Sequence, residues 1–289
     1  MGTAHTIKMV LNMVDSINTN AGSLLGVRSL QKSSSALAGT QKELSTGQKV
    51  SSAKDNAAIL SISQILKSNI AGLNSVKTSL DTAISSADVA LSAGGAVSEL
   101  LIDLKEKAVK AADPGLDEQS RLALNDEFVA LRDQITSTVE AASFNGKNAL
   151  NAGGDDIAAI LGSSGEGSIT VEAQDLSLGG ANVTLAAGDD IRTQANAEAA
   201  VSAIEDSISN VSDALSTLGS GAAQLEQTKD FTETLQTKTQ EGLGNLVDAN
   251  LASTSAAFEA NQVKQALGVL SLSIANQAPS SLLTLFQKQ

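Results

Sequence analysis

VSAIEDSISNVSDALSTLGSGAAQL, residues 201–225, carries its apolar side chains alternately three and four positions apart. The positions are Val201, Ile204, Ile208, Val211, Leu215, Leu218, Ala222 and Leu225. Such a heptad repeat puts one narrow apolar stripe along a helix, and the stripe is buried when the helix packs lengthwise against another. The pattern predicts a long helix whose partner lies in the same chain, with a partner in another chain as the alternative.

A longer helical pattern lies earlier in the chain. Apolar residues recur about every three and a half positions from Ile59 to Val109, and the pattern stops at the Asp113-Pro114-Gly115 turn. Asp55 stands just before it and is expected to cap the helix by accepting hydrogen bonds from its first free amides. About fifty-five helical residues would extend roughly 80 Å. The sequence therefore predicts a rod rather than a globule.

A shorter helix is expected between the two, over about 117–140. Its apolar residues gather on one side, at Leu122, Leu124, Phe128, Leu131, Ile135 and Val139. Three amphipathic helices can bundle side by side. The predicted fold class is mainly α, with long antiparallel helical rods in a coiled-coil-like bundle.

Residues 143–195 have a different composition, in which glycine turns separate short alternating runs. The runs SITV (168–171) and ANVTL (181–185) predict small β-hairpins. Residues 151–195 are too few for a large separate domain, so we expect a short, solvent-exposed tip. The Gly-Asp-Asp turns at 154–156 and 188–190 lack the alternating oxygen ligands of a calcium loop, and turn formation explains them.

Composition argues against several classes of function. Aromatic residues make up 2% of the 289 residues, with no Trp and no Tyr, whereas enzyme pockets rely on aromatic side chains. The net charge of −13 disfavours nucleic acid or an anionic membrane as a partner. The chain has no Cys and a single His, His5, with no ligand cluster beside it. We expect no catalytic residues, no cofactor and no metal site.

The two ends of the chain are rich in Ser, Thr, Asn, Gln, Gly and Ala, with sparse apolar residues at near-helical spacing. Ordering about eighty such residues costs on the order of 100 kcal/mol, which one narrow stripe on each end cannot offset. Neighbouring copies could cover these stripes and the terminal LLTLF run (282–286). We therefore expect an inner core domain formed by both termini, disordered in the monomer and helical in a polymer.

The expected assembly interface consists of the apolar residues of these two ends. They are Ile17, Leu24, Leu25, Leu30, Leu37, Leu251, Phe258, Val263, Leu267, Leu270, Ile274, Leu282, Leu283, Leu285 and Phe286.

A set of short motifs resembles bacterial flagellin, in the same order and at similar separations. They are SINTNA (16–21), ELSTGQKVSSAKDNAA (43–58), SFNG (143–146), ANQAP (275–279) and LLTLF (282–286). The resemblance covers about 16–150 and 196–289, and the short middle is similar to the compact flagellins of alphaproteobacteria.

The resemblance implies a structural subunit that self-assembles into the extracellular flagellar filament for swimming motility. It implies an inner core of 16–48 and 246–289, a helical rod domain of 49–150 and 196–245 with a hairpin that contains the FNG motif, and the solvent-exposed variable tip of 151–195. Implied partners are further copies of the chain, the flagellar type III export apparatus, and the filament cap and hook–filament junction proteins. An export route of this kind would explain why the chain begins without a cleavable Sec-type signal peptide.

Two departures from the family pattern stand out. Fifteen residues precede Ser16, so Met9 or Met13 is a candidate start and 1–15 a leader. At residues 102–110 this chain has the sequence IDLKEKAVK. The resemblance implies that flagellins that trigger the vertebrate innate flagellin receptor carry QRVRELAVQ in this place, so Asp103 stands at the position of the first Arg in that motif. We expect poor receptor activation, because charge reversal at a contact is costly. The equivalent region comprises Asp103, Leu104, Lys105, Glu106 and Val109.

Two other readings stay open. A hook–filament junction protein would have similar termini, although the FNG and LLTLF motifs favour flagellin. An enzyme-bearing or adhesive filament protein would need an activity in the insert, and about forty-five residues without a ligand cluster do not favour one.

Overall fold

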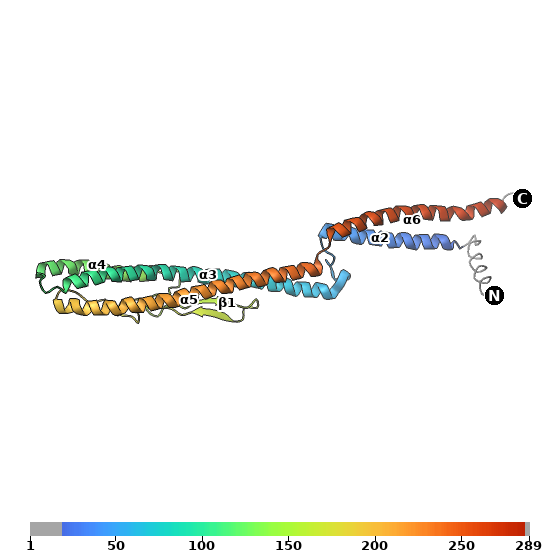
Figure 1. Cartoon of the computed structure of the whole chain (residues 1–289). Helices are drawn as coiled ribbons and strands as arrows, with labels where there is room; N and C mark the ends of the chain where they lie inside the picture. Colours follow the sequence, from blue (N-terminus) through green and yellow to red (C-terminus); the bar gives the residue numbers. More distant parts are fainter. Residues whose placement is uncertain (1–18, 287–289) are drawn as a thin grey trace, which may run out of the picture. The chain divides into compact units, whose positions relative to one another are not determined.

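The computed structural model describes residues 19–286, with side chains as far as Gln277, and shows a mainly helical chain (Figure 1). The helices are α2 (Ala21–Thr46), α3 (Ala53–Ala111), α4 (Glu118–Ala141), α5 (Gln194–Val247) and α6 (Leu251–Phe286), and the strands are β1 (Ile157–Ile160) and β2 (Ser168–Val171). The predicted fold class is confirmed. No helix among the described residues is both long and apolar enough to cross a bilayer.

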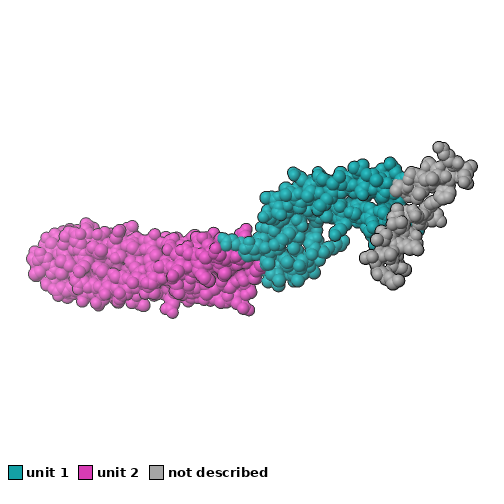
Figure 2. All heavy atoms as spheres, turned by 45° about the vertical axis from the view of Figure 1, so that its right-hand side comes forward, with its two compact units in different colours: residues 1–65, 241–289 teal, residues 66–240 magenta. Residues whose placement is uncertain are grey.

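The chain forms two compact units, coloured separately in Figure 2. Unit 1 contains the residues up to 65 and from 241 onward, so it joins the two ends of the chain. Unit 2 contains residues 66–240. Helices α3 and α5 each contribute to both units, because each boundary falls inside one of them.

In unit 2, α3 and α5 run antiparallel with a fixed register. Ion pairs join Lys77 to Glu233 at 2.6 Å and Lys105 to Glu205 at 2.9 Å. As the residue number rises along α3, the number of the residue opposite it on α5 falls by the same amount. The predicted heptad stripe faces this contact, since Ile204, Val211 and Leu218 are fully buried. The prediction that the stripe packs within its own chain is confirmed.

Helix α4 returns along α3 as a third helix of unit 2. Asp117 caps its start by accepting a hydrogen bond from the Ser120 amide at 2.9 Å. Lys107 of α3 pairs with Glu127 of α4 at 2.5 Å, and Phe128 is fully buried. The helix predicted over 117–140 is therefore confirmed almost to the residue.

The start of α3 differs from the sequence expectation. Asn56 interrupts the helix with extended backbone angles (φ −164°, ψ 105°), and its side chain accepts a hydrogen bond from the Ile59 amide at 3.0 Å. Asn56 is therefore the cap of the long helix, one residue after the predicted Asp55. Asp55 accepts instead from the amides of Ser51 and Ser52, because its carboxylate turns back into the preceding turn.

Only one of the two expected hairpin runs forms a strand. β2 pairs antiparallel with β1, with Ile157 opposite Val171, so the strand predicted at 168–171 is confirmed. The run 181–185 makes a single bridge, between Leu178 and Val183. The hairpin prediction there is wrong, because Thr184 bonds to α5 instead of to a second strand. Its amide donates to the Ser207 hydroxyl and its hydroxyl to the Ala203 carbonyl, both at 2.9 Å.

The segment predicted as an exposed tip packs along unit 2. Its apolar side chains at Leu176, Leu185 and Ile191 are fully buried in the same core as the helices. Val171 of β2 lies so close to α5 that a Cβ on Gly221 would be 2.5 Å from its Cγ1. Residues 151–195 therefore form, in part, a layer of the core, and glycine makes the close approach possible.

Candidate assembly interface

Helices α2 and α6 lie side by side in unit 1 and run antiparallel (Figure 1). At one end the Asn20 amide group donates to the Ala275 carbonyl at 2.7 Å. At the other, the Lys49 amide donates to the Val247 carbonyl at 2.8 Å, where the chain enters and leaves the pair. The two ends of the sequence thus meet, as the inner-core prediction required.

Both ends of α2 are fixed locally. The Asn20 side chain caps the start by accepting a hydrogen bond from the Ser23 amide at 2.9 Å, while it also binds α6. Gly47 ends the helix in the left-handed region at φ 70°, and its amide donates to the Glu43 carbonyl at 2.8 Å. A glycine is preferred there because it has no Cβ to clash. The helix therefore begins and ends within the pair it forms.

The α2–α6 seam, defined as the half-buried or buried positions where the two helices meet, is poor in large apolar residues. Its positions repeat every three or four residues, as in a coiled coil. They are Ser23, Gly26, Leu30, Ser33, Leu37 and Thr40 on α2, and Thr254, Phe258, Asn261, Gln265, Gly268, Leu272 and Ala275 on α6. Most of these side chains are small or polar, so the seam alone contributes little hydrophobic stabilisation.

Two reciprocal leucine–glycine contacts bring the helices together. A Cβ built on Gly26 would lie 3.3 Å from Cδ1 of Leu272, and one on Gly268 would lie 3.3 Å from Cδ1 of Leu30. A side chain on either glycine would therefore press against the opposite leucine, which would have to move by a few tenths of an ångström. Neither glycine was predicted as a contact residue, although both stand at positions of the three-and-four repeat that forms the seam.

The large apolar residues of the pair point mainly away from the seam. Leu25 is 68% exposed and Ile274 62% exposed. We call these residues the outer apolar surface: Leu24, Leu25, Val27, Leu44, Leu251, Val263, Leu267, Val269, Leu270 and Ile274. A soluble monomer rarely exposes so much apolar area on two adjacent helices, and such a surface marks a contact with another molecule.

The structure separates the predicted interface residues into three groups. The exposed group belongs to the outer apolar surface and comprises Leu24, Leu25, Leu251, Val263, Leu267, Leu270 and Ile274. Leu30, Leu37 and Phe258 are half-buried in the seam. Ile17, and the side chains of Leu282, Leu283, Leu285 and Phe286, lie outside the described residues. Val27, Leu44 and Val269 belong to the outer apolar surface but were not among the predicted interface residues.

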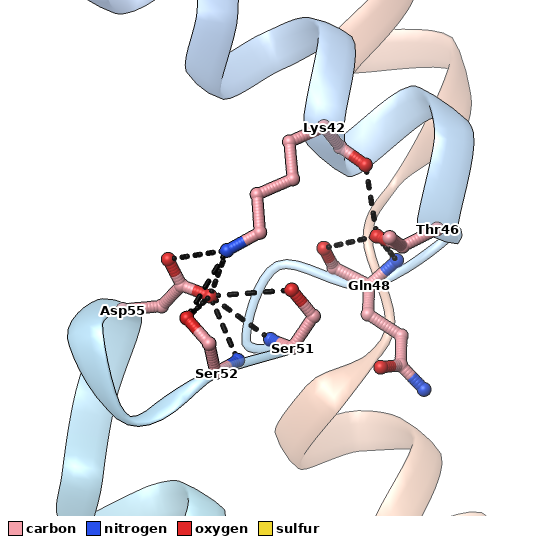
Figure 3. A network of polar contacts seen from close by, with 6 residues as sticks. All are labelled: Lys42, Thr46, Gln48, Ser51, Ser52 and Asp55. Atoms are coloured by element: carbon pink, nitrogen blue, oxygen red, sulfur yellow. Dashed lines mark hydrogen bonds and ion pairs between the residues drawn. The ribbon is translucent and has the colours of Figure 1, made fainter.

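A polar network fixes the turn from α2 into α3 (Figure 3). Lys42 donates to both oxygens of Asp55, at 2.9 and 2.7 Å. Asp55 also accepts from the amides of Ser51 and Ser52 at 3.1 and 2.9 Å. The hydrogen bond from Lys42 and those from the two serines hold the pKa of Asp55 well below its ordinary value. The ionised carboxylate therefore organises the turn.

The region aligned with the innate-receptor motif lies on α3 in unit 2. Asp103, Glu106 and Val109 are exposed, whereas Leu104 is fully buried and therefore inaccessible to a receptor. Lys105 is half-buried and pairs with Glu205 of α5. Glu106 pairs with Lys110, which lowers the pKa of Glu106. The accessible part of the predicted region is thus one polar face with a single valine.

Within the described part of the chain, no group of three or more His, Asp or Glu side chains is arranged to hold a metal ion. The outer apolar surface of unit 1 is instead the kind of surface that binds another protein molecule.

The family models and the curated relatives that match this chain belong to one family. The model of the bacterial flagellin N-terminal helical region matches residues 17–154, and that of the C-terminal helical region matches 201–286. Flagellin FljM of Caulobacter vibrioides is 38% identical over 274 residues, covering 95% of this chain and 99% of that protein. A flagellin of Brucella melitensis is 30% identical, covering 94% and 99%. The crystal structure of Bacillus cereus flagellin aligns with a TM-score of 0.47 and 24% identity, covering 53% of this chain and 88% of that one.

Proposed function

The chain belongs to the bacterial flagellin family, and we propose on that basis that its paired terminal helices form the surface through which it polymerises. It is a structural subunit of the extracellular flagellar filament. In the filament, neighbouring copies cover the outer apolar surface of α2 and α6.

The main support for this proposal is that most of the large apolar residues of the helix pair in unit 1 are exposed, whereas a self-contained pair would bury them between its helices. Most seam positions between α2 and α6 hold small or polar residues, while most of the large apolar residues of the pair face outward. Burying one such side chain stabilises by about 1.5–3 kcal/mol. Several of them per subunit, covered by neighbours, would add to the stabilisation from the seam and so help to offset the conformational entropy that the ends lose on ordering. Folding of the ends and polymerisation are therefore coupled.

The proposed domain roles follow the same division. Residues 16–48 and 246–289 form the inner core, 49–150 and 196–245 the rod, and 151–195 the short variable segment, which faces solvent on one side and packs along the rod on the other. The chain acts by assembly and is not an enzyme. Its further partners are the type III export apparatus, the filament cap and the hook–filament junction proteins, as inferred from the family.

Paired substitutions on α6 test the proposal. Leu267→Ser with Leu270→Ser removes two exposed leucines of the outer apolar surface and leaves the seam intact. We expect the critical concentration for polymerisation, measured by sedimentation, to rise at least tenfold, because even about 1.4 kcal/mol corresponds to that factor. Thermal unfolding of unit 2, followed by circular dichroism, should not change.

A matched control on the same helix is Gln262→Ser, which replaces an exposed polar residue. It should polymerise like the unmodified chain. Normal polymerisation of the double leucine variant would contradict the assigned surface.

A further inference from the structure

Unit 2 carries an apolar projection on α5. Phe231 is 66% exposed and Leu235, one turn later, is 42% exposed. Residues four apart lie on the same helix face, so the two side chains form one feature, which we call the Phe231 knob. Lys238 follows on this face and is also exposed. An aromatic side chain this exposed is unusual in a chain whose five Phe are its only aromatics.

Unit 2 also carries an open groove between α3 and α4. Its apolar lining comes from short side chains, which leave room for a larger one. The apolar lining includes Val89, Ala93, Ala130 and Ala141, and the carboxylates of Asp88 and Asp133 lie beside them. Asp133 is paired with Arg132 at 3.1 Å, so Asp88 is the carboxylate available to an incoming cation.

We propose that the Phe231 knob of one copy occupies the α3–α4 groove of a neighbouring copy in the filament. This rests on the proposed function, because in a homopolymer the molecules beside each subunit are identical copies. The knob supplies one aromatic and one leucine, and the groove supplies small apolar walls. Lys238 beside the knob carries the charge opposite to that of Asp88 beside the groove.

The positions of knob and groove favour an open-ended contact. Lys77 faces Glu233 and Lys105 faces Glu205, so position 90 of α3 lies opposite position 220 of α5. Phe231 is eleven residues from position 220, which is about 16 Å along the helix at 1.5 Å per residue. The contact therefore joins two different surfaces, the knob of one copy and the groove of the next, and it shifts the second copy along the helix axis. Such heterologous contacts repeat from copy to copy, as a filament requires.

Disulfide trapping tests this contact, because the chain has no Cys of its own. Leu235→Cys keeps Phe231 in place, and Ser92→Cys puts a thiol in the groove. The two single variants are copolymerised and oxidised with diamide, and covalent dimers are read on a non-reducing gel. We expect dimers in filaments and none in unpolymerised mixtures. Glu226→Cys, exposed elsewhere on α5, should give none with Ser92→Cys.

A second measurement uses the knob itself. Phe231→Ala should raise the critical concentration about tenfold, as for a central aromatic contact, and Phe231→Leu should largely restore it. Filaments that form normally without crosslinks, or an unchanged critical concentration for Phe231→Ala, would overturn this contact and leave the proposed function standing. Failure of the unmodified chain to polymerise would overturn both.

Discussion

Single residues show where the sequence was informative and where it was not. The turn between α2 and α3 contains Asp55-Asn56, and either side chain can cap a helix. The sequence predicted Asp55, but the cap is Asn56, because Lys42 and two serine amides hold the Asp55 carboxylate in the turn. Lys42 is thirteen positions away in sequence. A capping pattern covers only a few neighbouring residues, so it cannot predict a hydrogen bond to a side chain thirteen positions away.

The Asp55 network has a definite pH dependence. Its folded-state pKa is lowered, so its stabilisation is complete above the unfolded pKa of about 4 and is lost as pH falls below it. Asp55→Asn should lower the melting temperature of filaments equally at pH 7 and pH 5. The difference from the unmodified chain should shrink below about pH 4. A difference that stays constant or grows on acidification would contradict this assignment.

Asp103 is the residue on which the innate-receptor prediction depends. It is exposed on α3, at the position where receptor-activating flagellins are expected to carry Arg. In a reporter-cell assay we expect weak activation by this protein and stronger activation by Asp103→Arg, because the charge reversal is removed. Activity of the unmodified protein equal to that of a potent flagellin would contradict the prediction.

Helices were the elements most accurately predicted. The heptad over 201–225 specified both a helix and its buried stripe, since the period of apolar residues records which face is covered. Strands were less accurate. ANVTL (181–185) alternates like a strand, yet Thr184 bonds to α5. Its partners lie about twenty residues later in the chain, and alternation alone cannot distinguish a strand from an extended segment packed on a helix.

Two glycines on α5 give a matched test of how the middle segment packs. A Cβ added to Gly219 would meet no other atom within 4 Å, whereas a Cβ on Gly221 would be 2.5 Å from Val171 of β2. Gly219→Ala should raise the free energy of unfolding by up to about 1 kcal/mol through helix propensity. Gly221→Ala should lower it by about 1–3 kcal/mol through overpacking. Chemical denaturation measures both, and equal effects would contradict the packing of β2 on α5.

At the scale of the whole molecule, the sequence predicted that the two ends pair, and α2 and α6 do so. It did not predict which apolar residues face inward. That choice depends on small seam residues such as Gly26 and Gly268, which allow close approach and leave the larger residues outside. The boundaries of the two units, within α3 and α5, were likewise not visible, because composition does not change there.

The most direct test is negative-stain electron microscopy of the purified chain after salt-induced polymerisation, beside a version lacking residues 279–289. We predict filaments from the full chain and none from the truncated one, because in the proposed assembly neighbouring copies cover the terminal apolar residues. Replacing any one of these side chains with Ala should destabilise the filament by about 2–5 kcal/mol per subunit, the range for a buried apolar side chain. The side chains are those of Leu282, Leu283, Leu285 and Phe286. Filaments from both chains, or from neither even on preformed flagellar seeds, would contradict assembly through the paired termini.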